Sequence, residues 1–129
     1  MMMLKSSLTL FALAALLIGP TACKKDAKTG DKTSAAKIDE AGAQKLYKTL
    51  CTSCHGVKGA GDGAASAALK PKPRNFGDAA WQKSVTDQQI KDTISKGGAA
   101  VGKSPLMPAS PSSPEVLNGL VKIIRGFAK

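Results

Sequence analysis

The feature that most constrains this chain is the stretch Cys51-Thr-Ser-Cys-His55. It places two thiols three positions apart and the only histidine directly after the second. From residue 39 onward the only aromatic residues are Tyr47, Phe76, Trp81 and Phe127. A domain of about 90 residues with so few large side chains needs a staple or a large apolar guest to be stable. We therefore expect the Cys-Cys-His stretch to hold such a group.

The first 22 residues have the pattern of an export signal. Lys5 supplies a positive start, and Leu8 to Ile18 form an apolar run of eleven residues that Gly19 and Pro20 end. Such a run is too short to cross a bilayer, which takes roughly 20 residues. We therefore exclude residues 1–22 from the fold and expect the rest of the chain to be exported to the periplasmic side of a bacterial membrane.

Cys23 follows this signal in the sequence Pro-Thr-Ala-Cys. The stretch resembles a bacterial lipobox, in which cleavage before a cysteine is coupled to its lipidation, although Pro20 replaces the usual aliphatic residue. We predict lipid attachment at Cys23; ordinary cleavage nearby, which leaves a free or discarded thiol, is the alternative. An odd number of cysteines, three, does not suit a disulfide scaffold. The number is explained if Cys23 carries lipid and Cys51 and Cys54 act as a pair.

Residues 23–38 form a Lys-rich segment with no apolar periodicity, which predicts a flexible tether. The chain carries a net charge of +10, of which residues 24–38 hold five Lys and two Asp. This tether could touch anionic lipid head groups or be a solvated spacer. The remaining positive charge is spread out and no nucleic-acid motif is present, so we do not expect DNA or RNA binding.

Residues 39–129 predict an all-α domain with a helix at each end and long loops between. The expected helices lie within residues 39–51, 78–84, 86–98 and 113–129, with a further turn at 64–69. Thr86 and Gln89 predict a capping box at the start of the third of these helices, and Gly97 predicts its end. Ser113 and Pro114 suit the start of the last helix. Long loops inside a compact domain usually mark a binding function.

Cys-x-x-Cys-His is a signature of covalent haem attachment. Cys51 and Cys54 would form thioethers with the haem vinyl groups, and His55 would be the proximal iron ligand. A thioredoxin-like redox pair is an alternative, but it belongs beside a βαβ pattern that the chain lacks. Half a zinc site is another, but its fourth ligand is missing. The sequence therefore predicts one haem c.

Met107 is the candidate for the second axial ligand. It is the only Met beyond the signal, and Pro105 and Pro108 stiffen the loop around it. A thioether ligand favours reduced iron and raises the reduction potential. The alternative role for Met107 is to fill a gap in the core.

With these residues placed, residues 39–129 resemble a small class I cytochrome c. The resemblance rests on Leu-Cys-Thr-Ser-Cys-His-Gly, on Ser-Pro-Leu-Met-Pro-Ala, on the two terminal helices, and on the stretches 59–63 and 69–76. It implies the fold of that family, in which two terminal helices cross and long loops wrap a single haem. It also implies that the haem would supply much of the core, packed by Leu46, Leu50, Phe76, Trp81, Leu106 and the terminal helices.

The resemblance also implies contacts around that haem. In the family a backbone carbonyl of the proline-rich stretch accepts the ring N–H of the proximal His, which fixes the imidazole. Pro71 or Pro73 would supply this carbonyl, and Pro73 is the favoured one. Arg74 and Trp81 are candidates to bind the haem propionates; a solvated Arg and a core Trp are the alternatives.

The family further pairs a Gly of the first helix with an aromatic residue of the last, where the two helices cross. Gly42 matches the first position, whereas Ile123 stands where the family often has Tyr or Trp. Gly119 and Gly126 are costly inside a helix. We therefore expect the last helix to depend on contacts with the haem.

Two axial ligands from the protein leave no open coordination position, which favours electron transfer in a respiratory chain over substrate chemistry. A haem sensor or peroxidase-like enzyme with a labile Met107, or a haem subunit of a larger complex, are the alternatives. The domain's Lys residues could guide acidic redox partners or serve solubility. Because Lys24 is not the Asp that retains some lipoproteins at the inner membrane, the outer membrane is favoured.

Overall fold

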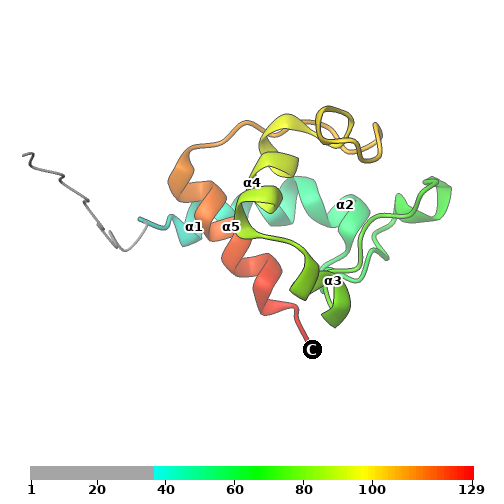
Figure 1. Ribbon diagram of the computed structural model, residues 1–129, viewed down its shortest axis with the longest axis horizontal. Coiled ribbons are helices and arrows are strands. Elements are labelled where there is room, and N and C mark those ends of the chain that lie inside the picture. Colours follow the sequence, from blue (N-terminus) through cyan, green and yellow to red (C-terminus); the bar gives the residue numbers. More distant parts are fainter. Residues whose placement is uncertain (1–36) are drawn as a thin grey trace, which may run out of the picture. The chain divides into compact units, whose positions relative to one another are not determined.

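The structure, a computed structural model, describes residues 37–129. Every regular element in this range is helical, which confirms the all-α prediction (Figure 1). The α-helices are α1 (Glu40–Leu46), α2 (Thr52–His55), α3 (Ala79–Ser84), α4 (Asp87–Lys96) and α5 (Pro114–Gly126). A π-helical turn (Tyr47–Cys51) joins α1 to α2, and 3₁₀ turns span Ser66–Ala68 and Ala99–Val101. The expected signal peptide, Cys23 and most of the tether lie outside the described residues.

Side-chain caps set the helix boundaries. The Asp39 carboxylate accepts from the Gly42 N–H at 2.8 Å to begin α1. The predicted capping box of Thr86 and Gln89 is formed, and Ser113 caps α5 with Pro114 at its first turn. Each cap satisfies backbone N–H groups that the first helical turn leaves without partners. None of the helices in residues 37–129 combines the length and apolar character needed to cross a membrane.

The two terminal helices, α1 and α5, pack against each other, as expected for this fold. The small residues at their contact are Ala43 and Gly119. The three atoms nearest to a Cβ built on Gly42 all belong to the side chain of Asp39, which caps the same helix. The expectation that Gly42 lies at the crossing is therefore wrong, because the face that α1 turns to α5 is centred one residue further along.

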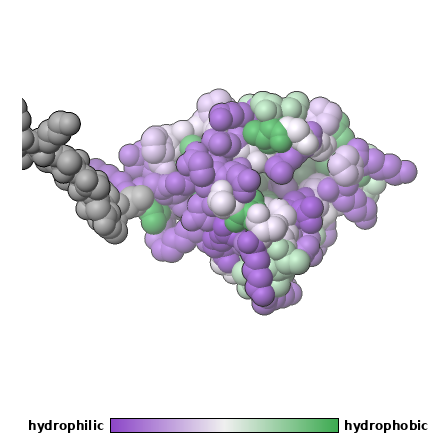
Figure 2. Space-filling view, viewed as in Figure 1, coloured by the Kyte–Doolittle hydropathy of each residue, from purple (hydrophilic) through white to green (hydrophobic). Residues whose placement is uncertain are grey.

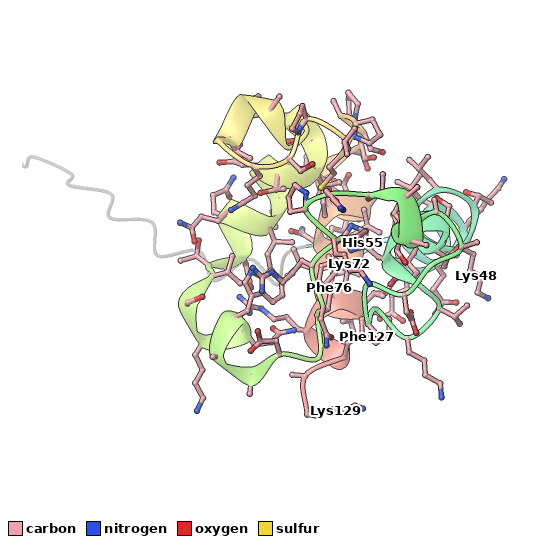
Figure 3. All side chains as sticks on the ribbon, turned by 90° about the vertical axis from the view of Figure 1, so that its right-hand side faces the viewer. Lys48, His55, Lys72, Phe76, Phe127 and Lys129 are labelled. Carbon is pink, nitrogen blue, oxygen red and sulfur yellow. The ribbon has the colours of Figure 1, made fainter. Side chains whose placement is uncertain are left out.

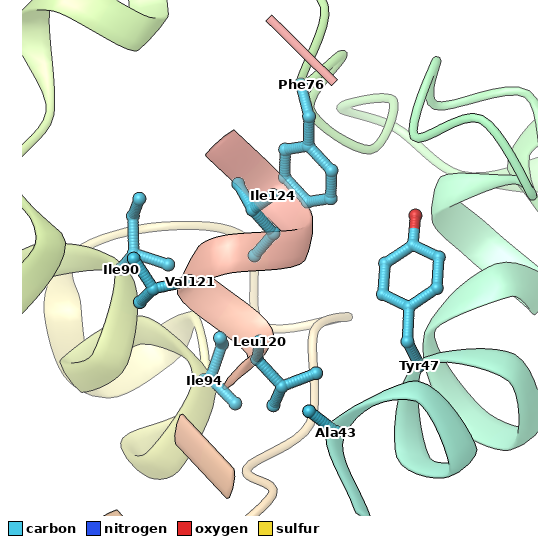
Figure 4. Close-up of a cluster of buried hydrophobic side chains, with 8 residues drawn as sticks. All are labelled: Ala43, Tyr47, Phe76, Ile90, Ile94, Leu120, Val121 and Ile124. Carbon is cyan, nitrogen blue, oxygen red and sulfur yellow. The ribbon is translucent and has the colours of Figure 1, made fainter. Parts of the chain in front are cut away.

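The buried core gathers around α5 (Figure 4). Its members are Ala43, Tyr47, Phe76, Ile90, Ile94, Leu120, Val121 and Ile124. Ile90 and Ile94 share the buried face of α4, as their spacing of four residues predicts. The core therefore lies among α1, α4 and α5, while the proline-rich loop contributes only Phe76.

Arg125 of α5 fastens the junction of α3 and α4 to the core. Its guanidinium donates to Gln82 O, Gln82 Oε1 and Val85 O at 2.7–2.8 Å, and to Asp87 Oδ1 at 2.8–2.9 Å. Gln82 in turn donates to the carbonyls of Phe76 at 2.7 Å and Ile124 at 2.9 Å. This network links the loop that carries Phe76 to the last helix.

Candidate functional site

The Cys-Cys-His stretch lies where one helix changes its winding. Cys51 is the last residue of the π turn, and Cys54 and His55 belong to α2. The Thr52 N–H donates to Tyr47 O, five residues back, which is the wide spacing of a π turn. Gly56 ends α2 with φ 78°, a conformation that favours glycine. Two thiols and an imidazole thus come from two consecutive turns.

Cys51 and Cys54 are both half-buried free thiols. Burial raises the pKa of Cys51, and the neighbouring Cys54 raises it further. An attacking thiol of a thioredoxin-like pair has a lowered pKa instead, so the opposite shift argues against that alternative. Within residues 37–129 no three His, Cys, Asp or Glu side chains come together as a metal site. The zinc alternative therefore gains no ligand from the fold.

His55 is oriented by a backbone carbonyl, but not by the expected one. Its Nδ1 lies 3.3 Å from Arg74 O. The carbonyl of Pro73 faces Gly61, where an added Cβ would lie only 2.4 Å from that oxygen. The assignment of Pro73 to His55 is therefore wrong by one residue, because the extended chain alternates the direction of successive carbonyls.

The surroundings of His55 suit a metal ligand. Burial lowers the pKa of His55, while the hydrogen bond with Arg74 opposes this shift. The neutral imidazole is therefore the dominant form at pH 7. With the proton on Nδ1 directed at the carbonyl, Nε2 retains its lone pair. This is the tautomer that an axial iron ligand requires.

Phe76 lies face to face with His55 (Figure 3). The ring centroids are 4.5 Å apart and the planes differ by 14°. Phe76 was expected to pack against the haem, but the contact with this imidazole was not expected. Phe76 lies two residues after Arg74, whose carbonyl faces His55. This closeness in the sequence is the one signal that could have indicated the contact between Phe76 and His55.

Arg74 and Trp81 lie on the outer side of Phe76. The Arg74 guanidinium is 3.6 Å from the Asp78 carboxylate and 6.0 Å from the centre of the Trp81 ring. The Trp81 ring packs on Phe76, with 5.5 Å between centroids. Trp81 thus packs on Phe76, and Arg74 lies near the Trp81 ring. The binding of haem propionates by Arg74 and Trp81 stays a prediction.

Met107 is held in a loop that closes on the end of α4. Met107 O accepts from the Gly98 N–H at 2.9 Å, and Met107 N–H donates to Ser104 O at 3.2 Å. Gly98 has no room for a side chain, because an added Cβ would lie 2.0 Å from Ser104 O. The Met107 side chain is half-buried and packs against the core cluster. The loop is therefore fixed, whereas iron ligation by Met107 stays a prediction.

Large apolar side chains remain exposed beside these residues. Leu50 precedes Cys51 and is 44 % exposed, Val57 follows His55 by two and is 80 % exposed, and Leu106 precedes Met107 and is 51 % exposed. Leu50 and Leu106 were expected to pack against a haem. Exposed apolar side chains next to the Cys-Cys-His stretch and Met107 fit a large apolar guest. The thiols, the imidazole and these side chains together fit a covalently bound haem.

A helical domain with a Cys-x-x-Cys-His helix defines a c-type haem protein. The cytochrome c family model matches residues 40–120, and the chain belongs to this family. A solved structure, the KustC0563 c-type cytochrome, is similar at 32 % identity with a TM-score of 0.53. The match covers 67 % of this chain and 98 % of that one. No curated protein matches. Cys51 and Cys54 have the spacing that fits covalent haem c, and the domain fits an electron carrier.

Proposed function

We propose that this protein carries single electrons in a respiratory chain through one haem c with His55 and Met107 as axial ligands. The observation that carries the proposal is the geometry of the π turn and α2, where Cys51, Cys54 and His55 occupy consecutive turns and Arg74 O holds the Nδ1 side of the imidazole. Nε2 is then the ring nitrogen available to a metal. The family gives the coarse function, haem binding and electron transfer, and the proposal adds the ligands.

Met107 supports the proposal through the stiffness of its loop. Two backbone hydrogen bonds fix Met107 to Gly98 and Ser104, and the Ser110 N–H donates to Ile94 O at 2.8 Å. A thioether held in place by its loop needs little rearrangement between two oxidation states. With haem bound, the cofactor supplies the one-electron chemistry, and the protein tunes its potential and access. A second ligand from the protein leaves no position for substrate.

We also propose that the domain works on the periplasmic side of a bacterial membrane, held by a lipid on Cys23. The signal-like residues 1–22 and the cysteine at position 23 support this location. The described chain begins against α5, where Asn118 Nδ2 donates to Lys37 O at 3.0 Å and Asp39 N–H donates to Glu115 O at 3.1 Å. Residues 37–39 are therefore held on α5 by two hydrogen bonds.

The partners that we propose are redox proteins with acidic docking surfaces. Ten exposed Lys side chains lie on the described domain beyond the tether: Lys45, Lys48, Lys58, Lys70, Lys72, Lys83, Lys96, Lys103, Lys122 and Lys129. Figure 2 shows a face that is largely hydrophilic, with hydrophobic residues in small groups. Positive charge around small apolar groups suits brief, salt-sensitive encounters with a negatively charged protein.

The test is a redox titration of the exported protein, followed by carbon monoxide addition to its reduced form. A carrier shows one reversible one-electron transition, and carbon monoxide leaves its spectrum unchanged because Met107 holds the sixth position. The Met107→Ala variant should bind carbon monoxide readily. Ready binding by the unchanged protein would instead support a sensor or a peroxidase-like enzyme.

A further inference from the structure

The contact between His55 and Phe76 is a part of the site that the Cys-x-x-Cys-His motif does not explain. The two rings are nearly parallel, with 14° between their planes and 4.5 Å between their centroids. Stacked aromatic rings are favoured at this separation. The hydrogen bond of Nδ1 to Arg74 O, at 3.3 Å, lies beyond the usual range for an N–H donor. Stacking on Phe76 is therefore a second constraint on the ring, beside the hydrogen bond with Arg74 O.

Phe76 is itself fixed from several sides. Its N–H donates to Gly59 O at 2.7 Å, and its carbonyl accepts from Gln82 Nε2 at 2.7 Å. Its ring is 7 % exposed and packs against Trp81 at 5.5 Å and Phe127 at 6.4 Å between centroids. The backbone of Phe76 is therefore fixed, and its ring cannot turn away from the imidazole without opening the core.

We propose that Phe76 is a positioning residue that sets the rotation of the His55 imidazole about its bond to iron. The inference rests on the proposed function, because it requires His55 to be a ligand. A bond from Nε2 lies in the plane of the imidazole, so rotation about that bond tilts the ring plane. A parallel neighbour 4.5 Å away opposes this rotation by direct contact over the ring face, in addition to the single hydrogen bond at Nδ1.

The consequence for the iron is spectroscopic. The direction of the imidazole plane relative to the four haem nitrogens sets how the iron d orbitals split. The g values of low-spin ferric iron in electron paramagnetic resonance report that splitting. Groups that orient a ligand tune the metal in this way without touching it. Phe76 should therefore define one ring orientation and one narrow signal.

The first experiment uses the unchanged haem-loaded protein in its diamagnetic reduced form. Proton NMR should show nuclear Overhauser cross-peaks between the ring protons of His55 and those of Phe76, because the rings are in contact. The absence of these cross-peaks would overturn the proposal. This measurement does not depend on whether any variant folds.

The second experiment compares Phe76→Leu with Phe127→Leu in the oxidised state. Phe127 packs on the far side of Phe76 and on Tyr47, at 5.6 Å between centroids, so it shares the core without stacking on His55. Phe76→Leu should shift the largest g value and broaden its signal. Phe127→Leu should lower the denaturation midpoint and leave that g value unchanged. Equal g values in Phe76→Leu and the unchanged protein would overturn the proposal.

Failure of this inference differs from failure of the proposed function. A low-spin spectrum with the long-wavelength sulfur-to-iron band, but without cross-peaks or a g shift, removes only the role of Phe76. A high-spin spectrum that lacks the band in the unchanged protein contradicts the axial ligands themselves.

Discussion

Gly119 of α5 and Ala43 of α1 approach so closely that a Cβ built on Gly119 would lie 2.6 Å from the Cβ of Ala43. The same added atom would lie 2.7 Å from Asp39 O. Ala43 is fully buried. A glycine in a helix interior costs about 1 kcal/mol relative to alanine, and here that cost is offset by the close packing that it permits between the two terminal helices.

Gly119→Ala should therefore destabilise the protein, although alanine is the better helix former. We expect a loss of about 1–3 kcal/mol in the free energy of unfolding, the usual range for overpacking. Gly126→Ala is the matched control, because an added Cβ there meets nothing within 4 Å. It should leave stability unchanged or raise it by up to about 1 kcal/mol. Chemical denaturation followed by circular dichroism measures both, and equal effects would contradict the close crossing.

The sequence predicted the elements whose signals are local. The capping box of Thr86 and Gln89, the stop at Gly97 and the start at Ser113 depend on residues within one turn, and the structure confirms all three. The short helix around Trp81 and the turn near Ser66 were also expected, from local polarity and spacing. Each of these signals depends on residues that are close in the sequence.

The features that were missed depend on contacts between distant residues. The π turn before Cys51 has no sequence signature of its own, because its residues also suit an α-helix. The carbonyl at His55 comes from Arg74 because of the path of the proline-rich loop. The bonds of Arg125 to Gln82, Val85 and Asp87 span about forty residues, beyond the reach of periodicity.

Tyr47 should make stability depend on alkaline pH. Its buried hydroxyl donates to Gly56 O at 2.9 Å, and burial, aided by Cys51 and Asp62, raises the pKa of Tyr47 to about 12. The pKa of an unfolded tyrosine is about 10. The neutral hydroxyl therefore contributes stability that is fully present below pH 10 and is lost as pH rises through 12. Full ionisation should remove at most about 2.7 kcal/mol.

The measurement for Tyr47 is urea denaturation at several pH values between 8 and 12. The comparison is with Tyr47→Phe, which keeps every other titratable group of the protein. The variant should be less stable near pH 8, because it lacks the hydrogen bond, and its stability should fall less steeply toward pH 12. Parallel curves for the two proteins would refute the role given to the hydroxyl.

Arg125→Lys should destabilise the domain despite keeping the charge. The guanidinium donates to three residues at once, which one ammonium cannot reproduce. We expect a loss of about 1–3 kcal/mol, since buried carbonyls of the α3–α4 junction would lose their donors. Lys122→Ala is the control, because the ion pair of Lys122 with Glu40 is exposed and contributes about 0–1 kcal/mol. Thermal melting of both variants measures the difference, and equal melting temperatures would contradict the role given to Arg125.

The salt dependence of the electron-transfer rate should show that the surface around the site is positively charged. Lys58 lies three residues after His55 and Lys103 four before Met107, and both are exposed. The rate of oxidation by anionic ferricyanide should fall as ionic strength rises, and Lys58→Gln with Lys103→Gln should weaken this dependence. Lys96→Gln, on a residue paired with Asp92 at 3.4 Å, is the control. A rate that does not respond to salt would contradict the docking proposal.

The absorption spectrum of the oxidised exported protein beside Met107→Ala and Leu106→Ala tests the central claim most directly. Leu106 is the exposed neighbour of Met107 and controls for disturbance of the loop. We predict a weak long-wavelength sulfur-to-iron band in the unchanged protein and in Leu106→Ala, and its loss in Met107→Ala. A protein that lacks this band, or a Met107→Ala variant that keeps it, would contradict ligation by His55 and Met107.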